Sequence, residues 1–243
     1  MAETQEIDCI NCLKGNIYCC KKCFEDDEIY IFKCLTEKEL EYLIDEKQQI
    51  TFKAGETIVK QNSSSTYVVC IREGLAKVYI EGEKGKNLIV RLIHKHDFVT
   101  GGGLFNVELQ PFTISAATSV TCCLIDSVKI AKLFSENKQF AIELLRHHTK
   151  QNNYLLSKLV NLTQKYMPGR VADTLLYLKN DIYNDNIFTV PFSRQDLADM
   201  SNMTKESFVR ILQQFKESNI VAVQGNTIEI IDEISLNSIS KNG

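Results

Sequence analysis

Residues 193–212 read SRQDLADMSNMTKESFVRIL, the pattern of two short helices joined by a tight turn. Ser193 can cap the first helix with Asp196 as its reciprocal partner, and Thr204 can cap the second. Asn202 falls in the turn, where the backbone needs a left-handed residue and Asn is the best substitute for glycine. Together these residues predict a helix-turn-helix.

The side chains of this motif divide into an apolar set and a polar set. Leu197, Phe208, Ile211 and Leu212 supply the packing, and Ala198 is small where the two helices cross. The polar remainder of the second helix can face a DNA major groove, where Arg pairs with guanine and Glu accepts from cytosine N4. We therefore predict these contacts to double-stranded DNA: Arg194, Thr204, Lys205, Glu206, Ser207, Val209 and Arg210.

The segments around this motif complete a winged domain. RVADTLLYLKN (170–180) reads as a helix and IFTVPF (187–192) as a short strand. NIVAVQGNTIEII (219–231) reads as a hairpin that turns at Gln224-Gly225-Asn226, which would form the wing. The net charge of −3 gives no general attraction to nucleic acid, so DNA binding has to come from this local element.

A long helix is predicted before this domain, in FAIELLRHHTKQNNYLLSKLVNLT (140–163). Its seam positions alternate in steps of three and four, as in a coiled coil. A polar Asn at such a position fixes register and favours two strands, which indicates a homodimer; the alternative is an amphipathic helix packed on its own chain. Pro168-Gly169 then marks a hinge or boundary. The predicted seam is Leu145, His148, Asn152, Leu155, Leu159 and Leu162.

In the first half of the chain, one short helical pattern is followed by apolar residues that alternate with a period of two. LTEKELEYLIDE (35–46) reads as a helix with Thr36 as its N-cap and Glu39 three residues later. Short alternating or apolar runs follow from residue 50 to residue 126, separated by turns at several glycines. Strands at this spacing predict a small antiparallel roll or barrel. The glycines are Gly55, Gly74, Gly82 and Gly85.

With these parts in place, the sequence resembles the Crp/Fnr family of bacterial transcription regulators over nearly its whole length. The matching motifs are FKAGETIVKQN (52–62), IREGLAKVYIEG (71–82), FSRQDLADMSNMTKESFVRIL (192–212) and IVAVQGNTIEI (220–230). The resemblance implies an α+β fold: an antiparallel β-roll (double-stranded jelly roll) sensor domain, a long dimerisation helix and a C-terminal winged helix-turn-helix. We expect the Cys-rich segment at 1–34, the cyclic-nucleotide-binding-like roll at 35–138, the dimerisation helix at 139–166 and the DNA-binding domain at 167–243.

The resemblance also implies how such a protein works. It implies a homodimer on an inverted-repeat operator, with Glu206 and Arg210 reading a G·C-containing half-site, and RNA polymerase as a further partner. No Ser/His/Asp or paired-carboxylate set suggests catalysis, so we expect no enzymatic activity. The competing interpretation is a zinc or thiol-redox protein whose C-terminal helical domain binds a protein partner.

The segment that would bind a cyclic nucleotide departs from the family pattern. Members that bind cyclic AMP carry a Gly-Glu pair for the ribose and an Arg-Ser pair for the phosphate. In HDFVTGGGLFNVELQPFTISAAT (96–118), Gly101 stands at the Glu position, and no Arg or Lys lies between Gly103 and Ala117. A buried phosphate without a guanidinium would be poorly compensated, so we expect a signal other than cyclic AMP.

Five of the nine cysteines fall in CINCLKGNIYCCKKC (9–23). The oxygen-sensing branch of the family holds an iron-sulfur cluster with three N-terminal cysteines and one from the roll, which would imply a 4Fe-4S cluster here and sensitivity to redox, oxygen or NO. The spacing differs from that branch, and two CxxC pairs could instead close a zinc site, form a thiol switch, or bind nothing. The candidate ligands are Cys9, Cys12, Cys19, Cys20, Cys23, Cys122 and Cys123.

The start of the chain, MAETQEIDC, has no apolar run that would read as a signal peptide. No stretch approaches the roughly 18 to 20 apolar residues that span a bilayer. We therefore expect a cytoplasmic protein without a membrane partner, whose thiols stay reduced.

Overall fold

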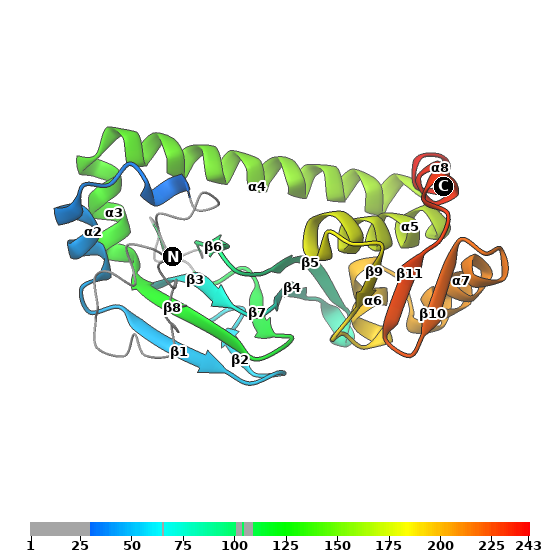
Figure 1. Ribbon diagram of the computed structural model, residues 1–243. Helices are drawn as coiled ribbons and strands as arrows, with labels where there is room; N and C mark the ends of the chain where they lie inside the picture. Colours follow the sequence, from blue (N-terminus) through cyan, green and yellow to red (C-terminus); the bar gives the residue numbers. More distant parts are fainter. Residues whose placement is uncertain (1–29, 65, 101–103, 105–108) are drawn as a thin grey trace, which may run out of the picture. The chain divides into compact units, whose positions relative to one another are not determined.

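The computed structural model describes residues 30–64, 66–100, 104 and 109–243. It divides into two compact units. One holds the described residues up to Ala76 together with Ile93–Gln151, and the other holds Lys77–Leu92 together with Asn152–Gly243. Figure 1 labels the helices and strands of both units.

The first unit contains an antiparallel sheet with the strand order β1-β8-β3-β6. Its strands are β1 (Gln48–Phe52), β8 (Val120–Asp126), β3 (Tyr67–Glu73) and β6 (Phe98–Val99). Strands β2 (Thr57–Val59) and β7 (Thr113–Ala116) also pair antiparallel. Strand β3 is buried almost throughout, because both of its faces are covered in the roll.

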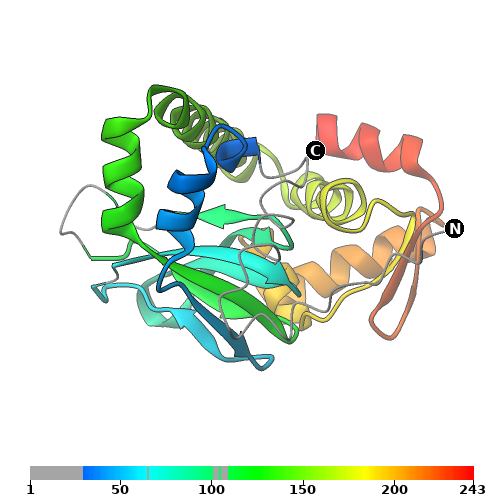
Figure 2. The same ribbon diagram turned by 60° about the vertical axis from the view of Figure 1, so that its left-hand side comes forward.

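Helices cover one face of this sheet. Helices α2 (Glu37–Ile44) and α3 (Ser127–Glu136) lie side by side at the end of β1 and β8 (Figures 1 and 2). Their buried side chains meet the inward residues of β3 and β8, the 3-10 helix η2 (Tyr30–Phe32) and the first turns of α4 (Lys138–Gln164) in one core. The capping box predicted for Thr36 and Glu39 forms at the start of α2.

Glycine is required at one turn of this roll and only convenient at another. Gly74 has a φ of +86°, and a Cβ there would lie 2.1 Å from the carbonyl oxygen of Ser119. Gly55 has a similar φ of +88°, but nothing lies within 4 Å of a Cβ built there. The Gly74 turn therefore excludes any side chain by direct overlap as well as by backbone conformation.

The second unit contains the helix-turn-helix. Helix α5 (Met167–Tyr177) begins with Pro168 in its first turn and continues as a π-helix, η4 (Leu178–Tyr183). Helices α6 (Arg194–Met200) and α7 (Lys205–Glu217) follow, and α8 (Glu233–Asn242) closes the chain. A three-stranded sheet has the order β10-β11-β9, formed by β10 (Val221–Gln224), β11 (Thr227–Ile230) and β9 (Ile187–Thr189).

Strands β4 (Ala76–Glu81) and β5 (Asn87–Ile93) are neighbours in a sheet, joined through the short 3-10 helix η3 (Glu83–Gly85). Residues 77–92 of this hairpin belong to the second unit. The Tyr177 hydroxyl accepts from the backbone N–H of Leu92 at 3.0 Å, and the Tyr154 hydroxyl donates to the Val90 carbonyl at 3.3 Å. These bonds attach β5 to α5 and to the second half of α4.

Among the described residues, no helix combines the length and the apolar character that crossing a membrane requires.

Candidate nucleic-acid interface

The helix-turn-helix is held by the caps and the turn that the sequence predicts. Ser193 accepts from the backbone N–H of Asp196, and the Asp196 carboxylate accepts in return from the N–H of Ser193 at 2.9 Å. The Thr204 hydroxyl accepts from the N–H of Ser207 at 3.2 Å. Asn202 has a φ of 50°, so the left-handed turn residue is confirmed.

The predicted apolar set forms the packed side of both helices. Leu197, Ala198 and Phe208 are each 0% exposed. The N–H of Met203 donates to the carbonyl of Ala198 at 3.1 Å, which closes the turn directly over this small residue. A larger side chain at Ala198 would have to displace the turn, and its small size is therefore a packing requirement.

With its apolar side buried, α7 presents a polar side to solvent. Lys205, Glu206, Val209 and Arg210 are all exposed. Residues 206, 210 and 213 follow one another at helical spacing, so Gln213, which is also exposed, lies on the same side. Gln213 is not among the predicted contacts, because only the N-terminal end of the helix was expected to meet base edges. Its periodicity with Glu206 and Arg210 could have found it.

The first turn of α7 favours an ionised Glu206. Its pKa is held below its ordinary value by a backbone hydrogen bond and by the Thr204 side chain. An ionised carboxylate at this place can accept from the amino group of cytosine, and Arg210 one turn later can donate to guanine. Thr204 and Ser207 hydrogen-bond to each other at 3.2 Å, so both contribute to the cap.

Arg194 has a partner that the sequence did not indicate. Its Nη2 donates at 2.6 Å to the carbonyl of Gly225, at the turn between β10 and β11. The predicted hairpin is confirmed, with Gln224 opposite Thr227 and Gly225 at a φ of +59°. Arg194 thus connects the start of α6 to the tip of the wing. A second connection was missed: Arg170 on α5 donates to the carbonyl of Asn202 at 2.9 Å.

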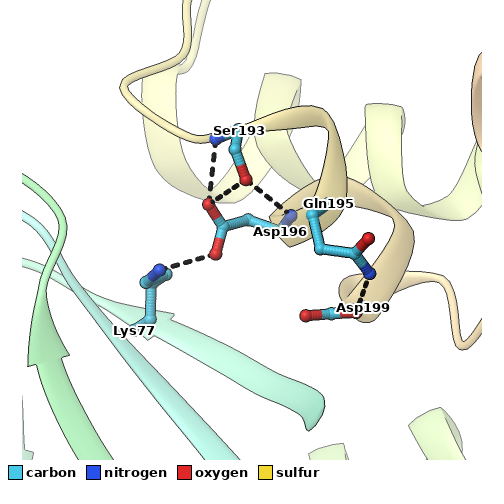
Figure 3. Close-up of polar contacts among 5 residues, drawn as sticks. All are labelled: Lys77, Ser193, Gln195, Asp196 and Asp199. Carbon is cyan, nitrogen blue, oxygen red and sulfur yellow. Dashed lines mark hydrogen bonds and ion pairs between the residues drawn. The ribbon is translucent and has the colours of Figure 1, made fainter. Parts of the chain in front are cut away.

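The Asp196 carboxylate also forms an ion pair with Lys77 on strand β4 (Figure 3). Lys77 Nζ lies 2.6 Å from Asp196 Oδ1. The other oxygen, Oδ2, accepts hydrogen bonds from both the hydroxyl and the backbone N–H of Ser193. Burial alone would raise the pKa of Asp196, but the hydrogen bonds from Lys77 and Ser193 outweigh it and hold the pKa below its ordinary value. Gln195 donates separately to Asp199 at 2.7 Å.

Two known domain families match this chain. Residues 169–239 match the Crp-like helix-turn-helix domain, and residues 49–137 match the cyclic nucleotide-binding domain. Both parts of the predicted architecture are therefore present, in the predicted order. The chain belongs to the Crp/Fnr family. It is a DNA-binding transcription regulator of the Crp/Fnr type.

Individual relatives of this Crp/Fnr regulator are distant. The chain is 23% identical over 199 residues to the "cAMP-activated global transcriptional regulator CRP" of Salmonella typhimurium, covering 80% of this chain and 95% of that one. It is 22% identical to the "Transcriptional activator protein FnrA" of Stutzerimonas stutzeri, covering 76% and 77%. Among solved structures, a putative Crp/Fnr-family regulator from Eubacterium rectale superposes with a TM-score of 0.75 at 16% identity, covering 89% and 100%.

The long helix α4 of this regulator carries an exposed apolar side. Leu145, Leu155 and Leu159 are 56%, 44% and 59% exposed, and Asn152 between them is exposed as well. His148 and Leu162 are only half-buried, and the His148 ring contacts the Thr100 hydroxyl at 3.3 Å. Leu156 and Val160, which the seam prediction left out, are also exposed, so the apolar side is wider than a simple seam.

The cysteines of the β-roll differ in their surroundings. Cys9, Cys12, Cys19, Cys20 and Cys23 lie outside the described residues. Cys122 and Cys123 are neighbours on strand β8 and point to opposite faces of the sheet, as successive strand residues do. Cys123 belongs to the core that contains η2 and is bordered by Cys34, with Lys47 Nζ 4.0 Å from its sulfur. Cys122 is absent from that core, and burial raises the pKa of its thiol to about 12.

Within the described part of the chain, no group of three or more His, Cys, Asp or Glu side chains could hold a metal ion. Cys34, Cys70 and Cys122 are free thiols. The five cysteines before residue 30 lie outside the described part.

Proposed function

We propose that this regulator binds an inverted-repeat operator as a homodimer, with α7 of each protomer reading a half-site that contains a G·C pair. The observation that carries this proposal is the exposed row of Glu206, Arg210 and Gln213 on a helix whose opposite side is fully packed. Glu206 can accept from cytosine and Arg210 can donate to guanine, so one base pair satisfies both. Two such helices would meet half-sites about 34 Å apart.

The dimer rests on the exposed apolar side of α4. Leaving several leucines of one helix in water is unfavourable. Burying each of them fully against a partner would stabilise the dimer by roughly 1.5 to 3 kcal/mol. A second copy of α4 offers the same surface in return, as a two-fold interface requires. Asn152, exposed among these leucines, would fix the register of the pair.

A pair of charge substitutions tests the dimer. We expect the native chain to sediment at twice the chain mass of 27.7 kDa. The double variant Leu155→Glu/Leu159→Glu should sediment as a monomer and lose the operator with two half-sites. Ile234→Glu is the matched control, since Ile234 is 85% exposed on α8 and should leave the dimer intact. A native chain that sediments as a monomer at micromolar concentration, or a footprint with a single half-site, would contradict the proposal.

We further propose that the signal is not cyclic AMP. The buried polar side chains of the described roll segment after residue 108 are Gln110, Thr113 and Ser115, all of them neutral. Neutral hydrogen bonds alone compensate a buried phosphate poorly. Calorimetry should record no binding of cyclic AMP at micromolar concentration. A micromolar dissociation constant would overturn this part of the proposal.

The cysteines are the proposed input in place of the nucleotide. Cys123 fits the role of the roll ligand better than Cys122, because it shares a core with η2 that Cys34 borders, and Lys47 Nζ lies 4.0 Å from its sulfur. Cys123 would then complete a 4Fe-4S site with three of the five N-terminal cysteines. Such a cluster would supply sensitivity to oxygen or NO.

Metal analysis after anaerobic purification tests this assignment. We expect iron and acid-labile sulfide in the native chain and in Cys122→Ser, and their loss in Cys123→Ser. Zinc in place of iron would favour the zinc alternative, and neither metal would leave a thiol switch. Retained iron in Cys123→Ser would refute Cys123 as the ligand.

A further inference from the structure

A cavity in the second unit remains unused by the proposed function. It has a volume of about 270 Å³ and lies among the second half of α4, α5, η4, the end of α6 and α8. All of its lining residues belong to the same compact unit. Those that matter here are Tyr154, Lys158, Arg170, Asp173, Tyr177 and Met200.

Two cationic side chains line this cavity without a full set of partners. Lys158 is half-buried, and within the described residues its amine makes no hydrogen bond or ion pair. Arg170 donates from one nitrogen to the carbonyl of Asn202, while its Nε–H is buried with no partner among the residues that the structure describes. A buried donor without an acceptor is costly, so the Nε–H of Arg170 would gain from a ligand that accepts a hydrogen bond, and the Lys158 amine would gain an anionic partner.

The carboxylates of the lining do not supply that acceptor. Asp173 holds Lys165 at 2.8 Å through both of its oxygens and also accepts from the Ser240 hydroxyl at 2.5 Å. Asp181 is exposed, where water and salt screen its charge. Counted together with Lys165, which pairs with Asp173 from outside the lining, three cationic side chains (Lys158, Lys165 and Arg170) stand against two carboxylates (Asp173 and Asp181). The cavity therefore keeps a net positive character.

The rest of the lining is apolar or aromatic. Leu162, Leu176 and Met200 form part of the wall, and the rings of Tyr154 and Tyr177 lie with their centroids 6.1 Å apart. An apolar cavity of about 150 Å³ is enough to hold benzene, so this one can hold a ring with a charged group attached. A small anion with an apolar body fits this combination of walls and charges.

We propose that this cavity binds a small organic carboxylate, whose charged group meets Lys158 and Arg170 and whose apolar body meets the tyrosines and Met200. Burial lowers the pKa of Lys158 to about 8, against the opposing effect of Asp173, so the amine is mostly protonated at neutral pH. The site adjoins the helix-turn-helix directly. Arg170 holds the turn at Asn202, and the buried hydroxyls of Thr174 and Ser201 lie 2.8 Å apart beside it.

Benzoate is the probe that tests this site, with benzamide as its uncharged isostere. Titration followed by calorimetry or ligand-observed NMR should show saturable binding of benzoate and at least about tenfold weaker binding of benzamide, as expected for a charge-assisted contact. Inorganic phosphate, which lacks the apolar body, should also bind more weakly than benzoate. No saturable binding of benzoate at millimolar concentration, or equal binding of benzamide, would overturn the proposal.

Two variants locate the binding. Lys158→Met keeps the aliphatic stem and should weaken benzoate about tenfold or more, while Arg170→Lys keeps a charge but removes the Nε–H and should also weaken it. Lys138→Met is the matched control, an exposed lysine on the same helix outside the unit, and should leave affinity unchanged. Circular dichroism confirms folding of each variant. Benzoate binding that Lys158→Met leaves unchanged, or that Lys138→Met weakens equally, would exclude this cavity.

Discussion

Asp196 shows how one residue can serve two contacts at the start of α6. One carboxylate oxygen completes the capping box with Ser193, and the other receives Lys77. Both side chains of the ion pair are only 20% exposed, so water screens the pair less than it would on an open surface. Removing the carboxylate charge should therefore affect both contacts, whereas removing the lysine should affect one.

We predict that Asp196→Asn lowers the free energy of unfolding by about 1 to 2 kcal/mol at pH 7, the usual cost of a weakened cap together with a lost pair. Lys77→Met should cost less, because the cap stays intact. Because the pKa of Asp196 is lowered in the folded state, its contribution is present at neutral pH and is lost as the pH falls below the ordinary value of 3.8. Urea denaturation measures both variants, and an equal loss in the two would contradict a separate role for the cap.

Lys158 also makes stability rise with pH, but in an alkaline range, and at neutral pH its charged form destabilises the folded chain where the ionised Asp196 stabilises it. Burial lowers its pKa from 10.5 to about 8. Between these values the unfolded chain binds more protons, so the stability contributed by this residue rises with pH. We predict that Lys158→Met raises the free energy of unfolding by about 1 to 3 kcal/mol at pH 7, and that the gain disappears near pH 10.5. A gain that stays constant with pH would show that Lys158 is not the cause.

At the scale of elements, two glycines with nearly the same φ provide a matched comparison. Gly74→Ala should cost more than about 2 kcal/mol, because its Cβ would overlap the Ser119 carbonyl oxygen as well as adopt an unfavourable conformation. Gly55→Ala should cost about 1 to 2 kcal/mol, the conformational part alone. Thermal or urea denaturation of the two variants measures the difference, and equal losses would contradict the role assigned to the overlap.

Local chemistry made several elements predictable from the sequence. The caps at Thr36, Ser193 and Thr204 mark the starts of three helices, and Asn202 marks the turn, because each satisfies backbone groups within a few residues. Helix α8 was not predicted, since only Leu236 of its side chains is buried and its periodicity is weak. Its cap, Asp232 with Ser235, has the spacing that could have revealed it.

The breaks between helices were harder to predict. The helical pattern runs on from α3 into α4, yet Asn137 separates them by accepting from the N–H of Phe140 at 3.0 Å. The extension of α5 into a π-helix likewise has no sequence signature here. Both depend on how a segment packs after it forms, which a pattern of apolar positions does not contain.

In the molecule as a whole, contacts between residues far apart in the sequence cannot be predicted from local motifs. Lys77 and Asp196 are 119 residues apart, and neither lies in a motif that points to the other. The cavity at Lys158 likewise needs α4, α5, η4, α6 and α8 together before it exists. Helix α7 was predictable because its caps and its pattern of apolar residues are local to one helix, whereas these sites are properties of the assembled unit.

We infer that α7 reads a G·C pair through Arg210, and a double-mutant cycle distinguishes base reading from a contact to phosphate. The affinities of the native chain and Arg210→Ala are measured for the native operator and for one with the G·C pair replaced in each half-site, at one salt concentration. We predict that Arg210→Ala costs about 1 to 3 kcal/mol per half-site on the native operator and almost nothing on the altered one. Lys216→Ala, an exposed cation on the last turn of α7, should not distinguish the two. An equal loss on both operators would contradict base reading by Arg210.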